Sequence, residues 1–133
     1  MKPTTNEIVE INQVLALLSH IMDSRAYHRL SEVMTPDAFY DCTIFGFDTA
    51  TAFDAIAELM GRDGHAIAHH CTNVYVHEGQ GDSVGAISKG LGVLKDGGVA
   101  SITFVDTLLK TDAGWRISSH VLAFNTEAKT ESR

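Results

Sequence analysis

The sequence predicts an α+β fold in which three helices from the N-terminal half lie across the concave face of a strongly curved, mixed and mainly antiparallel sheet. Residues 5–61 carry apolar side chains at helical spacing. The chain after Gly64 reads as strands that are separated by short turns rich in Gly and Asp. A strongly bent sheet with helices across its concave side makes a cone-shaped barrel with one open end, and ligand pockets lie in such mouths.

The first helix is expected over residues 5–22, because apolar residues recur there three and four positions apart. Thr5 or Asn6 can cap its start. Asp23 and Ser24 interrupt the pattern. The helix should therefore stop just before this acidic residue.

Two further helices and one strand are expected before the main sheet. The second helix covers about residues 25–34 and is ended by residues 35–37, where a proline disfavours helix in the residue before it. The aromatic and β-branched residues 39–45 predict a strand, and residues 46–49 a turn. The third helix is expected over residues 50–61, again with one apolar face.

Four long strands complete the predicted fold. Their short Gly and Asp links are typical of hairpins, so we expect an antiparallel meander. The strands are expected at residues 68–78, 83–95, 99–111 and 115–124. Because no repeat or linker interrupts the chain, residues 1–133 should form one domain, with a core at about 6–124 and a polar tail at 125–133.

The composition excludes several classes of function. The 133 residues carry a net charge of −7, so nucleic acid and anionic membrane surfaces should be repelled. No apolar run is long enough to span a bilayer, and the first residues do not resemble a secretory signal. We therefore expect a cytoplasmic protein whose two cysteines, Cys42 and Cys71, are reduced. Nucleotide, dinucleotide and metalloprotease motifs are absent, and we expect neither cofactor nor metal.

The strand over residues 68–78 carries the first candidate site residues. Strand alternation would put His69 on one face together with Cys71, Asn73 and Tyr75. A face that only fills a core would rarely combine an imidazole, a thiol, a carboxamide and a phenol. We interpret this face as pocket-lining, and the alternative is that it is exposed to solvent or forms an oligomer contact.

Asp23 and His69 together make the sharper hypothesis. A carboxylate at a helix C-terminus faces the unfavourable end of the helix dipole, so Asp23 is either a plain surface or capping residue or a functional group tolerated in a poor setting. A carboxylate beside one imidazole nitrogen fixes the tautomer and raises the basicity of the ring. The other nitrogen can then take or return a proton near neutral pH. A Cys71 thiolate nucleophile is a weaker alternative.

Further side chains are candidates to line the pocket. Tyr40 could polarise a substrate oxygen, or it could be an amphipathic core aromatic. Asp106 lies among apolar neighbours, at the pocket rim or near a sheet edge, and Trp115 reads first as a core residue. The candidate substrate-binding set is Tyr27, Tyr40, Cys42, Cys71, Asn73, Phe104, Asp106 and Trp115. Among the other histidines, we expect His20, His28 and His65 to be solvated, and the sequence leaves His77 and His120 open.

Four segments together resemble the SnoaL-like domains of the nuclear transport factor two (NTF2)-like superfamily. They span about residues 6–124 in the right order and spacing, and they are Met22–Leu30, Thr35–Cys42, His69–Asn73 and Asp112–Ile117. The members most similar in the helix and histidine segments are scytalone dehydratase and hexachlorocyclohexane dehydrochlorinase. Both are cofactor-free lyases, and the resemblance carries their Asp–His pair onto Asp23 and His69. The other polar site residues of the dehydratase fall at Met22, Cys42, Leu94 and Phe104, which implies a different, hydrophobic or polycyclic substrate.

We therefore predict a cofactor-independent lyase or isomerase of the dehydratase, elimination or cyclase type. In it, His69 takes a proton next to a carbonyl or leaving group, and Tyr40 or Asn73 holds the developing oxyanion. The alternative is a non-catalytic small-molecule-binding or assembly module with the same fold. Val74 and Val76 are expected on the outer face of the sheet, and they predict a homodimer or homotrimer.

Overall fold

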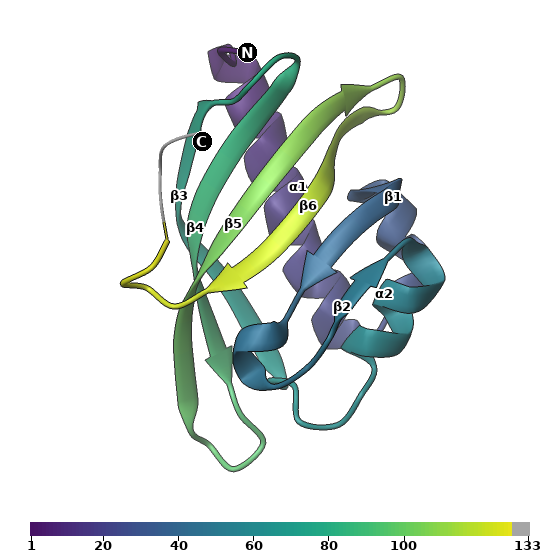
Figure 1. Ribbon diagram of the computed structural model, residues 1–133, viewed down its shortest axis with the longest axis vertical. Coiled ribbons are helices and arrows are strands. Elements are labelled where there is room, and N and C mark those ends of the chain that lie inside the picture. The colour runs from purple at the N-terminus through teal and green to yellow at the C-terminus, as the bar shows by residue number, and fades with distance from the viewer. Residues whose placement is uncertain (129–133) are drawn as a thin grey trace.

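The computed structural model describes residues 1–128, which form helices packed on one six-stranded sheet (Figure 1). The sheet order is β2-β1-β6-β5-β4-β3, and every pair is antiparallel except the parallel pair β1–β6. The α+β class is therefore as predicted, whereas strong curvature and a cone shape stay predictions. In chain order the elements are α1 (Thr5–Ser24), the 3₁₀ helix η1 (Tyr27–Glu32), β1 (Met34–Asp41), the 3₁₀ turn η2 (Thr43–Phe45), β2 (Thr49–Thr51), α2 (Phe53–Met60), β3 (Ala68–Glu78), β4 (Ser83–Val93), β5 (Val99–Thr111) and β6 (Gly114–Ala123).

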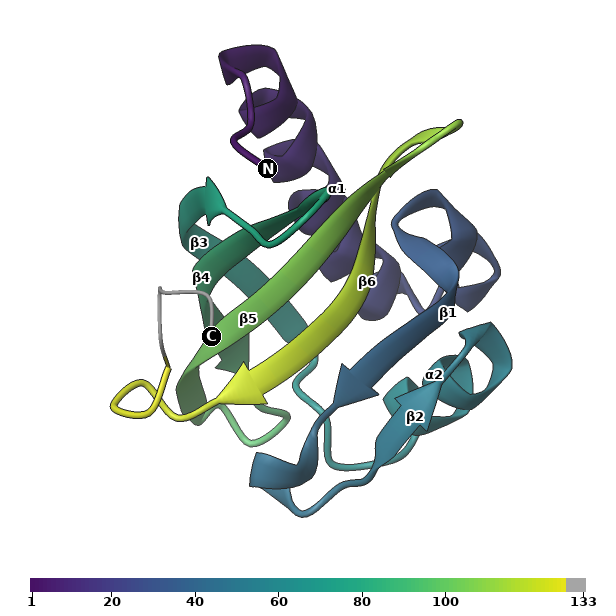
Figure 2. The same ribbon diagram turned by 45° about the horizontal axis from the view of Figure 1, so that its top comes forward.

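Helix α1 lies against one face of the long strands and supplies much of the core (Figure 2). Its cap is Thr4 rather than the predicted Thr5 or Asn6, because Thr4 and Glu7 form a reciprocal capping box. The helix ends at Arg25, which adopts the left-handed conformation with φ 55°. Asp23 therefore belongs to the last helical turn and does not interrupt the helix.

The segment between α1 and β3 differs most from the prediction. The expected second helix is only the 3₁₀ helix η1, and β1 begins at Met34, well before residue 39. Pro36 is tolerated because it falls where the β1–β6 register shifts, between the paired positions of Met34 and Phe39. The expected third helix is shorter, because β2 occupies its first residues and Ala52, with φ 74°, separates strand from helix.

The four C-terminal strands form the predicted antiparallel meander, but two β-bulges interrupt its alternation. In β3 the register shifts between Thr72 and Tyr75, around Asn73 with φ 54°. Asn73 and Tyr75 are consequently exposed, which corrects their predicted place in the pocket. In the β5–β6 hairpin the register shifts between Thr107 and Leu108, so that Asp106 lies opposite His120 instead of Ser119.

The bulge in β3 also overturns the reason given for an oligomer. Val74 and Val76 pack against the core instead of facing outward. The outer face carries a different apolar row, because four partly or largely exposed side chains lie opposite one another across β3 to β6. The row is Tyr75, Ile87, Val105 and Val121.

The end of β6 is tied to the outer face of the sheet. Asn125 accepts a hydrogen bond from Thr103 at 2.8 Å, and Lys89 donates to the same threonine at 2.9 Å. The polar tail expected from residue 125 therefore begins as an anchored turn, and residues 129–133 lie outside the described part. In the described part of the chain, no helix is both long and apolar enough to cross a membrane.

The strain at Asn73 yields a prediction about stability. A β-branched side chain in the left-handed region costs about 1–2 kcal/mol, so Asn73→Val should lower the free energy of unfolding by about that amount, and Asn73→Gly should not lower it. Urea unfolding followed by circular dichroism measures the change. Thr72→Val, at the preceding exposed strand position, is the matched control, and an equal loss there would contradict the bulge.

Candidate functional site

A cavity of about 210 Å³ lies between the inner face of the sheet and the loops on either side of α2. Its lining is largely apolar, and its polar side chains are Tyr40, Cys42 and three histidines. The lining residues are Met22, Tyr40, Cys42, Phe45, Phe47, Gly64, His65, Ala66, His69, Gly90, Leu91, Gly92, Leu94, Ala100, Ile102, Phe104, His120 and Leu122.

Two glycines of β4 help to shape this hollow. A Cβ atom at Gly90 would lie 2.5 Å from the Phe104 ring, and one at Gly92 would lie 2.9 Å from the Ala66 methyl group. Both contacts are shorter than any real Cβ contact, so a side chain at either position would force a neighbour to move. The sequence signal for the hollow is therefore the pair of glycines at alternate positions of one strand.

The predicted Asp23–His69 pair forms at the rim of this cavity. His69 Nδ1 lies 2.7 Å from Asp23 Oδ1, and the His69 backbone N–H donates to both carboxylate oxygens at 2.9 and 3.1 Å. The His69 side chain is 14% exposed and that of Asp23 is 32% exposed. These donors compensate the carboxylate for its place at the unfavourable end of the helix dipole.

The contact also fixes what His69 can do. Its Nδ1 is engaged by the carboxylate, so Nδ1–H donates and Nε2 carries the free lone pair. Nε2 has no hydrogen-bond partner among the described residues, and the ring lines the cavity. Asp23 and His69 are therefore arranged as an oriented base whose reactive nitrogen is available to a bound molecule.

A second Asp–His pair, which the sequence did not predict, lies beside the same cavity. Asp106 was expected at the pocket rim or near a sheet edge, and His120 was left open. His120 Nδ1 lies 2.5 Å from Asp106 Oδ1, and both side chains are almost fully buried. The His120 ring stacks on Tyr40 at 5.6 Å between centroids and meets Phe104 at 4.8 Å. His120 escaped prediction because an unbulged hairpin would place Ser119, not His120, opposite Asp106.

Tyr40 and Cys42 lie on the cavity wall as predicted, at the end of β1. Burial raises the pKa of the Tyr40 phenol, and the neighbouring Cys42 thiol raises that pKa further. Burial also raises the pKa of Cys42 itself. At neutral pH both groups are therefore protonated, so Tyr40 can donate a hydrogen bond to a substrate oxygen and Cys42 is a weak nucleophile.

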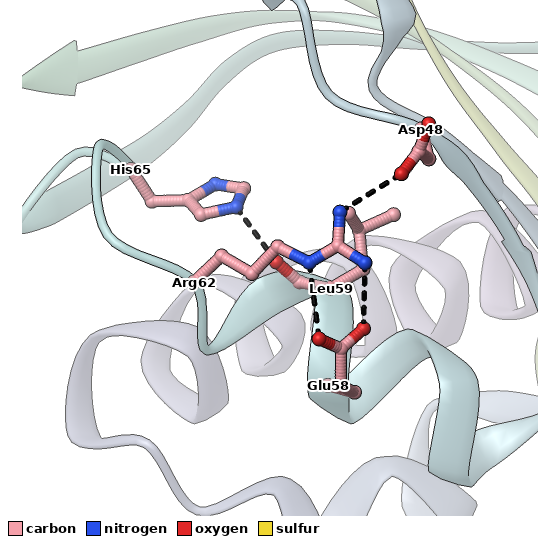
Figure 3. Close-up of polar contacts among 5 residues, drawn as sticks. All are labelled: Asp48, Glu58, Leu59, Arg62 and His65. Carbon is pink, nitrogen blue, oxygen red and sulfur yellow. Dashed lines mark hydrogen bonds and ion pairs between the residues drawn. The ribbon is translucent and has the colours of Figure 1, made fainter.

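Two loops that line the cavity contact each other. The His65 ring stacks on Phe47 at 4.2 Å, and its Nε2 donates to the backbone oxygen of Leu59 (Figure 3). This contact corrects the expectation that His65 is solvated. Arg62 lies nearby and bridges Glu58 of α2 to Asp48 of the other loop, as Figure 3 shows.

The remaining candidates lie away from the cavity lining. The Tyr27 hydroxyl donates to the Met60 backbone oxygen, beside a hollow of about 150 Å³ that also contains Asp23. Cys71 contacts Ser88 at 3.4 Å, and burial raises the pKa of its thiol. Trp115 is fully buried in the core, so its large ring fills space between α1 and β6 and is not a substrate contact.

A comparison with protein families matches the SnoaL-like domain over residues 3–121, which is most of the chain. The chain belongs to the SnoaL-like domain family. No curated protein matches this SnoaL-like sequence at a significant level. Within residues 1–128, no three His, Cys, Asp or Glu side chains gather as a metal site would require.

Solved structures support the same fold. One is an NTF2-like protein with a cystatin-like fold from Novosphingobium aromaticivorans, with 27% identity over 92% of this chain and 84% of that one, and a TM-score of 0.71. A provisionally named aromatic ring hydroxylase from the same organism has 22% identity over 93% and 92%, and a TM-score of 0.77. A provisionally named scytalone dehydratase, also from that organism, has 16% identity over 94% and 95%, and a TM-score of 0.71.

The positions where this SnoaL-like domain departs from the dehydratase pattern all lie on the cavity wall. They are Met22, Cys42, Leu94 and Phe104. An apolar or weakly polar side chain at each position makes the wall more hydrophobic than the pattern that it resembles. The departures therefore change the chemical character of the cavity wall.

The environment of His65 yields a prediction about pH. Burial lowers the pKa of His65 from its ordinary value of 6.5. As the pH drops through about 6.5, His65 is protonated in the unfolded chain before it is protonated in the folded chain. The free energy of unfolding therefore falls over this range. His65→Phe keeps the stack on Phe47 and should lose less of its thermal midpoint between about pH 7.5 and 5.5 than the wild type. His70→Phe, which changes an exposed histidine, should behave like the wild type.

Proposed function

We propose that this SnoaL-like domain is a cofactor-independent lyase or isomerase that acts on a small hydrophobic molecule, with His69 as the catalytic base. The observation that carries the proposal is the 2.7 Å contact between His69 Nδ1 and Asp23 Oδ1 at the edge of an apolar cavity. Asp23 is the positioning residue, because it holds the tautomer and stabilises the imidazolium that forms.

The proposed reaction begins with removal of a proton from carbon by His69 Nε2. The electron pair of the C–H bond then either expels a leaving group or moves into an adjacent carbonyl, which gives elimination or isomerisation. Tyr40 is the better of the two predicted oxyanion donors, since its hydroxyl is protonated and its ring lines the cavity, whereas Asn73 is exposed.

The size of the cavity narrows the substrate class. An enclosed cavity of about 150 Å³ accommodates benzene. A cavity of about 210 Å³ is larger by the volume of a few atoms, so it suits one substituted ring or two fused rings. A larger polycyclic substrate would have to extend beyond the cavity.

A second candidate function is that of a non-catalytic ligand-binding module. The largely apolar lining favours it, because such a wall binds hydrophobic molecules without requiring chemistry. In that case the Asp23–His69 contact would only satisfy two polar groups. The two candidates differ in whether bound molecules lose a proton from carbon.

The test reaction is the ring opening of 5-nitrobenzisoxazole, a two-ring molecule that eliminates when a base takes its single C–H proton next to nitrogen. Wild-type protein should accelerate the opening, and His69→Ala should lower kcat/KM by about 10²–10⁴-fold. Asp23→Asn should lower it as well, because an amide cannot stabilise the imidazolium. The rate is measured from the absorbance of the nitrophenolate that the ring opening forms.

The control for this test is His70→Ala, which removes the adjacent exposed imidazole on the opposite side of the strand. This variant should keep the wild-type rate. Thermal midpoints by circular dichroism verify that each variant is folded. Saturable binding of the probe with no acceleration by the wild type would favour the ligand-binding module instead.

We also propose that the protein is a homodimer or homotrimer, now through the outer row Tyr75, Ile87, Val105 and Val121. Partly exposed apolar side chains aligned across four strands are the kind of surface that a second copy covers. Size-exclusion chromatography with light scattering at micromolar protein should return the mass of two or three chains. Tyr75→Lys should shift it toward one chain, and a monomeric wild type would refute the proposal.

A further inference from the structure

The Asp106–His120 pair has no role in the reaction proposed for His69, yet it faces the same space. His120 lines the cavity, and both histidines also line a narrow void beside it, together with Asp106 and Phe104. The two imidazoles come from different strands, His69 from the edge strand β3 and His120 from the inner strand β6. Because both line the cavity, one molecule in it can contact both.

The geometry of His120 leaves one nitrogen for such a molecule. Nδ1 is held by Asp106, and Tyr40 and Phe104 pack on the ring. Nε2 has no hydrogen-bond partner among residues 1–128, and it is not among the fully occluded polar atoms of that range. The His120 side chain is only 3% exposed and it lines the cavity, so a molecule in the cavity is the partner that this nitrogen can reach.

The two pairs differ in how their carboxylates are compensated. Asp23 is partly exposed and accepts two backbone hydrogen bonds besides the imidazole. The Asp106 side chain is 1% exposed, and its Oδ2 has no partner among the described residues. A buried carboxylate is costly unless an opposite charge accompanies it, so the Asp106 pair favours a state with no net charge. In that state His120 presents Nε2–H, a donor, where His69 presents a lone pair.

We propose that His120 is a second catalytic histidine, positioned by Asp106, that protonates the leaving oxygen while His69 takes the proton from carbon. This proposal rests on the proposed function and deepens it: the substrate is a one- or two-ring molecule whose leaving group is a poorly departing oxygen. The C–H electron pair forms the new π bond, the carbon–oxygen or nitrogen–oxygen bond breaks, and the oxygen receives the Nε2 proton of His120. One proton enters His69 and one leaves His120, so the charge of the site is conserved.

A pair of probes separates this acid role from a structural one. Unsubstituted benzisoxazole opens by the same proton removal as 5-nitrobenzisoxazole, but its phenolate is much more basic and departs with more difficulty. A general acid therefore matters for the unsubstituted probe and little for the nitro probe. His69, as the base, matters for both.

The variant for this test replaces both partners, because His120→Phe alone would leave the Asp106 carboxylate buried without a partner. Asp106→Leu combined with His120→Phe retains a ring between Tyr40 and Phe104, and replacing both members of a buried polar pair is tolerated far better than replacing one. The double variant should lose about 10²-fold or more in kcat/KM on benzisoxazole. On 5-nitrobenzisoxazole the loss should be smaller, because the nitrophenolate departs without an acid, so the ratio of the two kcat/KM values should change by about 10²-fold or more.

A further variant keeps the imidazole. Asp106→Asn leaves an amide oxygen that can accept a hydrogen bond from His120 Nδ1, but it removes the negative charge that stabilises the doubly protonated ring. Like the double variant, it should therefore lose more rate on benzisoxazole than on 5-nitrobenzisoxazole. Thermal midpoints accompany both measurements. They show whether a variant has lost rate only because it has unfolded. Unfolding would lower kcat/KM on both probes together.

The outcomes distinguish the two proposals. If His69→Ala abolishes the turnover of both probes but the His120 variants lower both equally, or neither, His120 is not the acid and only this proposal fails. If the wild type turns over neither probe, the proposed function fails, and the acid role that rests on it fails too. A selective loss on benzisoxazole alone supports both.

Discussion

The contact between Asp23 and the start of β3 is the constraint on which the site depends. It joins residues 46 positions apart in the chain, through one imidazole and one backbone N–H. Its geometry requires that α1 continues through its last acidic turn and stops at Arg25, where the left-handed residue redirects the chain. Helix α1 packs directly on β3. Because Asp23 belongs to this helix and His69 to this strand, two rigid elements, rather than a loop, hold the carboxylate and the ring in contact.

The two β-bulges determine which side chains reach the interior. In β3 the extra residue turns Val74 inward and Tyr75 outward, and in β6 an extra residue near Ser118 and Ser119 turns His120 inward. A one-residue shift of register exchanges the two faces of a strand. The bulges thus let one strand present polar groups to the cavity at one end and apolar groups to α1 at the other.

The same bulges mark the limit of what the sequence could predict. The sequence predicted helix α1 from the spacing of its apolar residues and the four-strand meander from its Gly and Asp turns. It predicted the pairing of Asp23 with His69 from the chemistry of the two residues and from family resemblance. Asn73 was placed on the wrong face and His120 was left open, because strict alternation carries no mark of an inserted residue. Strand β2 has three residues, too few for a period, and His65 was misjudged because its partner Phe47 lies in another loop.

The loops on either side of α2 are joined by two contacts of different physical kinds, the Arg62 ion pairs and the Phe47–His65 stack. Arg62 pairs with two exposed residues, Glu58 and Asp48, through three carboxylate oxygens, so dissolved ions screen these pairs. The Phe47–His65 stack depends on contact between the rings instead. Rising ionic strength would therefore weaken the Arg62 ion pairs and leave the Phe47–His65 stack almost unchanged, so the two contacts between these loops differ in their response to salt.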